Sequence, residues 1–203
     1  MPSRMWLHGI HNFLELLRHR LPLSLEHMLA FIYLAYSMMA LLYETVPAFE
    51  DTWIECMGDL GRYRMAIEDD DVRDREVWQN VATFWYSKVA DKTPGVGRIY
   101  HHLAILARPN ILQQFFYYCK ALGVTQPFGS ARESILMVFD PIFNSDVFSG
   151  RRQAFDALFI QLHSVTFCHI EFEKFDPALC GFLDLLRKHI SGPQAKWKVS
   201  FGR

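Results

Sequence analysis

Several features that mark common protein classes are missing from this 203-residue sequence. The four cysteines form no CxxC pair, so neither a disulfide scaffold nor a zinc site is indicated, which fits a reducing compartment. The formal net charge is only -1, which argues against bulk binding to the phosphate backbone of nucleic acid. The first residues contain no apolar run followed by a small-residue cleavage site, so we expect no secretory signal.

No catalytic or metal-binding group of residues stands out either. We find no nucleophile with a neighbouring base and an orienting residue, so we expect neither an enzyme nor a cofactor. The segment PGVGRIY, residues 94–100, contains GxG without a third glycine or a preceding strand, which indicates a turn between helices rather than a nucleotide loop. Two groups lack the spacing and further ligands of a metal site: His8 with His11, and His163 with Cys168 and His169.

What the sequence does contain is a series of long helical patterns separated by proline, glycine and acidic residues. Strand signals are poor, so we predict an all-α chain. One break falls at Asp140-Pro141, and another is the acidic loop 68–74, where Asp71 and Asp74 favour the start of a helix. The expected helices span residues 6–19, 25–43, 51–67, 75–89, 97–107, 111–122, 131–139, 151–172 and 177–189.

The segment 28–43, MLAFIYLAYSMMALLY, is the longest uncharged stretch of the N-terminal half. It is shorter than the roughly 20 apolar residues needed to cross a bilayer. Glu26 and Glu44 bracket it, with no lysine or arginine immediately beside it. A buried helix is therefore favoured over a membrane span. Because the segment is apolar on all sides, we expect it at the centre of a helical array, with no membrane as a partner.

A tetratricopeptide-like repeat also fits the sequence. Such units have about 34 residues, two helices, small and aromatic residues at fixed places and a closing proline. Pro94 and Pro127 lie about one repeat apart, and Ala82, Tyr86 and Ala104 fall at the small and aromatic positions. The alternative is that any two amphipathic hairpins look alike. The agreement of all three residue types favours a repeat array with a concave ligand-binding surface.

The segment GDLGRYR, residues 58–64, carries two arginines on a helix with an apolar stripe. Tyr63 and Arg64 flank that stripe, whereas Arg62 lies nearly opposite, near Gly58 and Gly61. Small residues around an arginine leave room for a ligand, and a guanidinium binds phosphate bidentately. The alternative is a solvated arginine paired with an acid of its own helix or of the next loop. Periodicity alone favours this second interpretation.

Three more residues fall on groove-lining positions of the repeat register, namely Arg98, His101 and Arg108. They form a second candidate for contact with an anionic ligand. The alternative is an ordinary solvated surface.

Four segments, in the same order, resemble the Ever Shorter Telomeres/SMG family. GDLGRYR is similar to a segment of 14-3-3 proteins and of the 14-3-3-like domains of that family. The other three are GRIYHHLAILA (97–107) with FFYYCKAL (115–122), QPFGSARESI (126–135) and FIQLHSVTFCH (159–169). The resemblance covers roughly residues 25–190.

The resemblance implies an all-α, 14-3-3-like tetratricopeptide solenoid over residues 1–140, followed by the start of a helical-hairpin, DNA/RNA-binding-type region over 141–203. It implies a non-enzymatic adaptor in nonsense-mediated mRNA decay or telomere maintenance, in the nucleus, the cytoplasm or both. The expected partner is a phosphorylated protein or peptide contacted by Arg62 and Tyr63. RNA or single-stranded DNA is the alternative partner, favoured by the basic end of the chain, which contains Arg187, Lys188, Lys196, Lys198 and Arg203. A phosphate-independent scaffold is another alternative.

The sequence departs from the family pattern in three ways. A lysine on a preceding helix is the family's second phosphate contact, and here the comparable stretch offers His8 or Leu7. The family's initial helix pair is absent, and the chain ends soon after the hairpin begins. We therefore expect a diverged or truncated member.

Overall fold

The computed structural model describes residues 2–144, 151–170 and 172–191. This part of the chain contains helices and no β-strand, only an isolated bridge between Val96 and Gln126. The elements are α1 (Pro2–Arg4), the π-helix η1 (Met5–His11), α2 (Asn12–Arg18), α3 (Leu25–Thr45), the short 3-10 turn η2 (Pro47–Phe49), α4 (Glu50–Ala66), α5 (Val72–Lys92), α6 (Gly97–Leu106), α7 (Ile111–Gly123), α8 (Ala131–Asn144), α9 (Arg151–Cys168), the 3-10 turn η3 (Phe172–Lys174) and α10 (Phe175–Ser191).

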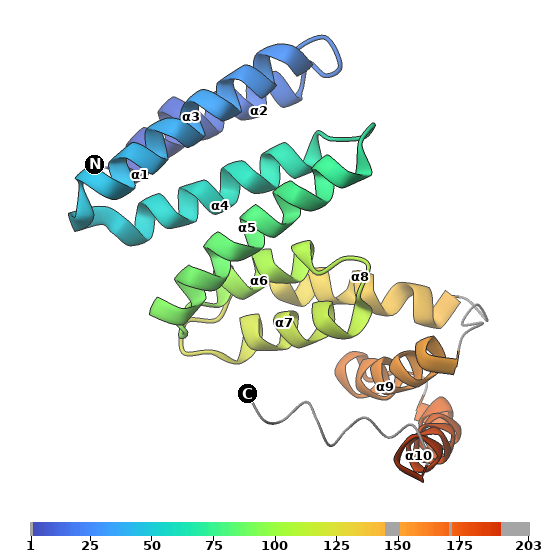
Figure 1. The fold of residues 1–203 in the computed structure, drawn as a ribbon. Helices are drawn as coiled ribbons and strands as arrows, with labels where there is room; N and C mark the ends of the chain where they lie inside the picture. Colours follow the sequence, from blue (N-terminus) through green and yellow to red (C-terminus); the bar gives the residue numbers. More distant parts are fainter. Residues whose placement is uncertain (1, 145–150, 171, 192–203) are drawn as a thin grey trace.

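The helices pack in the order in which they occur along the chain (Figure 1). Helix α3 contacts α2 and α4, α5 contacts α4 and α6, and α7 contacts α6 and α8. The array continues through α9 to α10, which packs on α9. The predicted all-α, solenoid-like fold is confirmed. The expected boundary between residues 140 and 141 lies inside α8, so the division into two regions stays a prediction.

Local signals explain some of the helix ends. The Asp71 side chain accepts hydrogen bonds from the Arg73 and Asp74 amides and so caps α5, which begins three residues earlier than expected. Helix α9 ends at Cys168, where His169 takes the left-handed conformation at φ 57°. The predicted break at Asp140-Pro141 is wrong, because α8 continues to Asn144 with Pro141 inside it. Pro141 is exposed, so water can solvate a helix turn that a proline weakens.

Helix α3 does not lie at the centre of the array, which overturns the expectation from its composition. One face, which carries Met28, Ile32, Ala35 and Met39, is covered by α2 and α4, and α5 contacts its edge, where Trp85 donates a 2.7 Å hydrogen bond to Tyr36. The opposite face is exposed, and 22% of the helix's most apolar window is buried. By length and composition α3 is also the one helix of the described residues that could cross a membrane. Uniform hydrophobicity therefore did not predict burial here.

The central helix is α4, which is buried on two sides. Its Ile54 joins a core with α5, α6, α7 and α8, whereas Trp53, Met57 and Leu60 join a second core with α2 and α3. Ten of its 17 residues are buried, including two glycines and two charged residues. Helix α4 therefore separates the two hydrophobic cores and contacts both.

Gly58 and Gly61 bring α4 close to α5. A Cβ atom at Gly58 would lie 2.8 Å from the Tyr86 ring, and one at Gly61 would lie 3.2 Å from the Ala82 backbone nitrogen. Contacts this short leave space only for hydrogen. The prediction that these glycines leave room for a ligand is therefore wrong, since a neighbouring helix fills the space.

A buried polar contact lies at the same place. The Tyr86 hydroxyl donates a hydrogen bond of 2.6 Å to the Asp59 carboxylate, and both residues are buried. On α6, the His102 ring stacks on the Tyr86 ring with centroids 5.0 Å apart and planes inclined by 12°. Burial lowers the pKa of His102 to about 4, with Arg62 acting in the same direction and Asp59 against it. Side chains from α4, α5 and α6 thus meet around one tyrosine.

The glycine contact predicts opposite effects for one substitution at two sites. Gly58→Ala should lower the free energy of unfolding by about 1 kcal/mol or more, because the Tyr86 ring, fully buried and held by Asp59, cannot move aside. Gly9→Ala, with nothing within 4 Å, should raise it by about 0.5–1 kcal/mol through helix propensity. Urea unfolding measures both. Equal changes at the two sites would contradict the close packing.

The buried histidine predicts a loss of stability in acid. Between pH 6.5 and 4 the unfolded chain binds a proton at residue 102 that the folded chain excludes, so stability falls as pH falls. His102→Phe keeps a ring against Tyr86 without this titration. The decrease in unfolding free energy from pH 7 to pH 5 should be about 2 kcal/mol smaller in the variant. If the unfolding free energies of wild type and His102→Phe, measured with urea, change equally with pH, the prediction is contradicted.

Candidate functional site

Arg62 is held loosely between two tyrosines. Its Nη2 lies 3.5 Å from an Asp59 carboxylate oxygen, and its Nε donates to the Tyr86 hydroxyl at 3.4 Å. Both distances are at the long limit for hydrogen bonds. The guanidinium also lies over the Tyr63 ring, 5.4 Å from its centroid. With 28% of the side chain exposed and five donors available, Arg62 retains capacity to bind an anion from solvent.

The hydroxyl group of Tyr63 is bound by a residue other than Arg62. The residue is buried, and its hydroxyl donates a 2.5 Å hydrogen bond to Glu15 of α2. Burial and then this bond raise the pKa of Tyr63. Glu15 also forms an ion pair with Arg18. The structure therefore places a carboxylate on the tyrosine hydroxyl that was predicted to contact phosphate.

The two positions considered for the family's lysine, Leu7 and His8, are both exposed on the π-helix η1. Neither supplies a permanent cation. On this side of Arg62 the charged group contacting Tyr63 is thus Glu15, from the next helix, α2.

Arg64 has a different environment although it is only two residues from Arg62. Its side chain is 7% exposed and forms ion pairs with Glu68, at 2.6 Å, and with Asp74. Its guanidinium also lies 5.9 Å from the centroid of a Trp78 ring. These contacts connect the end of α4 to the acidic loop and to the start of α5. Arg64 therefore stabilises the fold, as expected for a residue beside the apolar stripe.

Two of the predicted groove residues of α6 lie near Arg62. Arg98 forms an ion pair with Glu55 of α4. His101 lies among aromatic rings, 4.9 Å from Phe128 between centroids, and burial followed by the charge of Arg62 lowers its pKa. The result is a polar strip between α4 and α6, made of Glu55, Asp59, Arg62, Arg98, His101 and His102.

The polar strip holds two buried ring nitrogens, Nδ1 of His101 and Nδ1 of His102, that have no hydrogen-bond partner among the described residues. Such atoms are available to a ligand or to water. Among the same residues, no three His, Cys, Asp or Glu side chains are arranged to hold a metal ion.

Arg108 lies beyond the end of the strip. It is exposed in the turn after α6, ten residues from Arg98, or about 15 Å along a helix. Its carbonyl accepts a hydrogen bond from Gln79, and its side chain reaches Tyr118, whose pKa burial raises against the effect of Arg108. The structure therefore places Arg62, Arg98 and His101 along the polar strip, and Tyr118 connects its His101 end to Arg108, because the Tyr118 ring lies 5.7 Å from the His101 ring and Arg108 hydrogen-bonds Tyr118.

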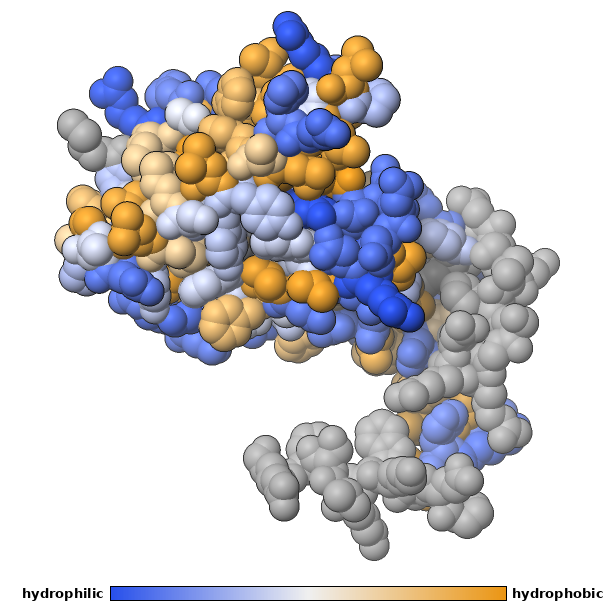
Figure 2. Space-filling view, turned by 45° about the horizontal axis from the view of Figure 1, so that its top comes forward, coloured by the Kyte–Doolittle hydropathy of each residue, from blue (hydrophilic) through white to orange (hydrophobic). Residues whose placement is uncertain are grey.

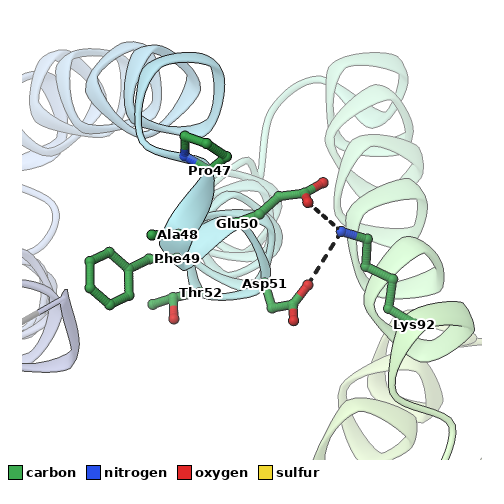
Figure 3. Close-up of a pocket in the computed structure, with 7 residues that line it drawn as sticks. All are labelled: Pro47, Ala48, Phe49, Glu50, Asp51, Thr52 and Lys92. Atoms are coloured by element: carbon green, nitrogen blue, oxygen red, sulfur yellow. Dashed lines mark ion pairs between the residues drawn. The ribbon is translucent and has the colours of Figure 1, made fainter.

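A pocket of about 370 Å³ lies at the opposite end of α4 (Figure 3). Its polar side is formed by Glu50 and Asp51, and Lys92 bridges both carboxylates at 2.7 and 3.4 Å. Glu50 and Arg62 are twelve residues apart, about 18 Å of helix. The lysine is engaged by two acids, so this pocket presents no positive charge comparable to Arg62.

Sequence reasoning missed Glu15 and His102 as members of this region. Tyr86 was identified only as an aromatic repeat position, and no local signal pointed to its hydrogen bond with Asp59. Glu15 lies 48 residues from Tyr63 in the chain, so only the folded structure brings them together.

Comparison with known proteins gives three relatives. The chain is 30% identical over 107 residues to the nonsense-mediated mRNA decay factor SMG7 of Arabidopsis thaliana, 51% of this chain and 9% of that protein. It is 23% identical over 142 residues to the EST/SMG-like protein 2 of Saccharomyces cerevisiae, 69% of this chain and 12% of that protein. It is 31% identical over 87 residues to the telomerase-binding protein EST1A of Danio rerio, 42% of this chain and 5% of that protein. The chain thus spans about an eighth or less of each relative.

The family model described as the Est1 DNA/RNA binding domain matches residues 82–191, more than half of the chain. The matched region runs from within α5 to the end of α10 and contains Arg98, His101 and Arg108. Arg62 and Tyr63 precede it. The match covers more than half of the chain and falls on an ordered array of helices, so the chain belongs to the Est1 DNA/RNA-binding domain family.

Proposed function

We propose that this chain is a non-enzymatic adaptor in telomere maintenance or nonsense-mediated mRNA decay, acting in the nucleus, the cytoplasm or both. Family membership supports this role, as do relatives whose names refer to mRNA decay and to telomerase binding. A helical array of this kind offers a long surface for a protein partner. The proposed architecture keeps residues 1–140 as the 14-3-3-like region and assigns 141–203 to the helical-hairpin region.

The proposed ligand is a phosphorylated peptide of the partner, and Arg62 is the proposed contact. The observation that supports this proposal is that, among the described residues, the part-exposed Arg62 guanidinium holds only two long hydrogen bonds. Arg98 and His101 lie on the same polar strip and would extend the contact toward α6. Phosphate oxygens provide the short, charge-assisted acceptors that Arg62 lacks.

Glu15 would weaken phosphate binding near Tyr63. Its carboxylate accepts from the Tyr63 hydroxyl and would repel a phosphate dianion there. Hydrogen bonds from Tyr63 and Arg18 lower the pKa of Glu15 against the opposing effect of burial, so the carboxylate is charged at neutral pH. We therefore propose that phosphate binds to Arg62 on the α6 side, and that Tyr63 contributes its ring face rather than its hydroxyl.

This proposal predicts opposite effects at Arg62 and Glu15. Arg62→Glu should weaken binding of a phosphoserine peptide by about tenfold or more, because a charge-assisted hydrogen bond is lost. Glu15→Gln should strengthen it several-fold by removing the repulsion. Fluorescence anisotropy with a phosphoserine peptide panel, each peptide beside its unphosphorylated form, measures both. Arg73→Glu, on the exposed start of α5, is the charge-matched control. Equal affinity of wild type and Arg62→Glu would exclude phosphate binding here and leave a phosphate-independent scaffold.

The second candidate function is binding of RNA or single-stranded DNA, favoured by the family match over residues 82–191. Arg108 is exposed within that range. Of the basic end, Arg187 and Lys188 are exposed in the last turns of α10, whereas Lys196, Lys198 and Arg203 lie outside the described residues and stay a sequence-based argument.

Nucleic-acid binding predicts a steep dependence on salt. Each neutralised phosphate releases counterions, so affinity for a single-stranded oligonucleotide should fall strongly as salt rises from about 50 to 200 mM. Arg108→Glu should weaken binding and reduce the slope by about one, whereas Arg62→Glu should leave both nearly unchanged. An electrophoretic mobility series measures these values. No binding at the lowest salt concentration would exclude this function.

A further inference from the structure

The outer face of α3 is an apolar surface that nothing in the described part of the chain covers. The residues that point outward are exposed, with Leu34 at 68% and Leu41 at 60%. Met38 flanks them on one side and is 39% exposed, and on the other side Tyr33 is 50% exposed and marks the edge of the face, because its ring packs on Trp78 of α5. In the space-filling view, hydrophobic side chains gather over the N-terminal helices at the top of the molecule (Figure 2). A contiguous apolar face of this kind on a helix is suited to a partner.

The spacing on this face is that of a helix that packs on another helix. Outward positions recur as His27, Ala30, Leu34, Ser37, Leu41 and Glu44, at alternating intervals of three and four residues. This is the heptad pattern of a helix-pairing seam. Large residues, Leu34 and Leu41, alternate with the small residues Ala30 and Ser37. The Ser37 hydroxyl already donates to the Tyr33 carbonyl at 2.9 Å, so its burial would leave no unpaired hydroxyl proton.

The seam is complementary to itself when a second α3 runs antiparallel to it. With the two-fold axis between residues 35 and 36, Ala30 faces Leu41 of the second copy and Leu34 faces Ser37. Each layer thus pairs one large with one small side chain, which fills space evenly. At both ends His27 faces Glu44, a hydrogen-bonding pair of opposite charge when the histidine is protonated.

We propose that α3 is a homodimer interface, in which the outer faces of two copies pack antiparallel about a two-fold axis. A lipid surface fits this face less well. Helix α3 contains no lysine or arginine, whereas Glu26 and Glu44 lie at its two ends. The alternation of large and small residues also has no role against lipid chains. The interface lies outside the polar strip, so both copies keep Arg62 accessible.

The interface predicts a reversible dimer that one charge disrupts. Sedimentation equilibrium of wild type should give twice the 23.7 kDa monomer mass at high concentration and the monomer mass on dilution. Leu34→Glu should raise the dissociation constant about a hundredfold or more, because it buries two carboxylates near the axis. Met137→Glu, at a 56% exposed apolar position of α8, is the matched control and should leave the dimer intact. Circular dichroism confirms that both variants fold.

Cysteine crosslinking tests the antiparallel geometry. Ala30→Cys and Leu41→Cys variants, one of them tagged, are mixed and oxidised, with wild type showing the background from native thiols. Crosslinks should form only between the two variants, since residues 30 of the two copies would lie about 16 Å apart along the axis. Crosslinking within each variant would show a parallel pair. That result would overturn the proposal. So would a wild type that stays monomeric, a monomer that binds lipid vesicles, or a dimer that survives Leu34→Glu.

Discussion

The close contact of α4 with α5, made where two glycines face Tyr86 and Ala82, is the constraint on which the rest of the structure depends. It brings the Tyr86 hydroxyl within 2.6 Å of Asp59 and places the same ring against His102 of α6. Three helices are thereby joined by one buried aromatic residue. A Cβ at Gly58 would push this ring away, and the hydrogen bond and the stacking would be lost together.

This contact also explains why two arginines of one helix differ. Arg62 follows Asp59 by one helical turn, and the Asp59 Oδ1 that it approaches at 3.5 Å also accepts the 2.6 Å hydrogen bond from Tyr86. Arg64 has two carboxylates within ion-pair distance and is nearly fully buried. The structural arginine has short ion pairs to two carboxylates, although its buried Nε has no partner among the described residues, whereas the candidate ligand-binding arginine has only long contacts with them. The difference lies in the acceptors near each guanidinium, which are two carboxylates for Arg64 and one oxygen shared with Tyr86 for Arg62.

The N-terminal part of the chain presents two surfaces of different chemistry. The polar strip between α4 and α6 carries paired charges and two histidines with unpartnered ring nitrogens. The outer face of α3 carries no charge between His27 and Glu44. The family match begins at residue 82, inside α5, so both surfaces include residues that precede it. Binding of a charged ligand and pairing of two copies can therefore occur on one chain without competing for the same residues.

The helices themselves followed from the sequence, because the periodicity of apolar residues and the positions of proline, glycine and Asp71 are local properties. All the expected helices exist, and the main local error was Pro141, where the helix continues past a residue that usually ends it. The placing of Arg64 beside the core and of Arg62 away from it also followed from helix geometry.

Only the tertiary structure decided what each helix face meets. Composition indicated that α3 would be central, but its position near the end of the array leaves one face exposed, whereas the less apolar α4 is buried on both sides. The glycines beside Arg62 suggested space for a ligand, but α5 occupies that space. Glu15 reaches Tyr63 across 48 residues of sequence. Burial, close approach and charge pairing depend on neighbours that are distant in the chain, and a local pattern contains no information about them.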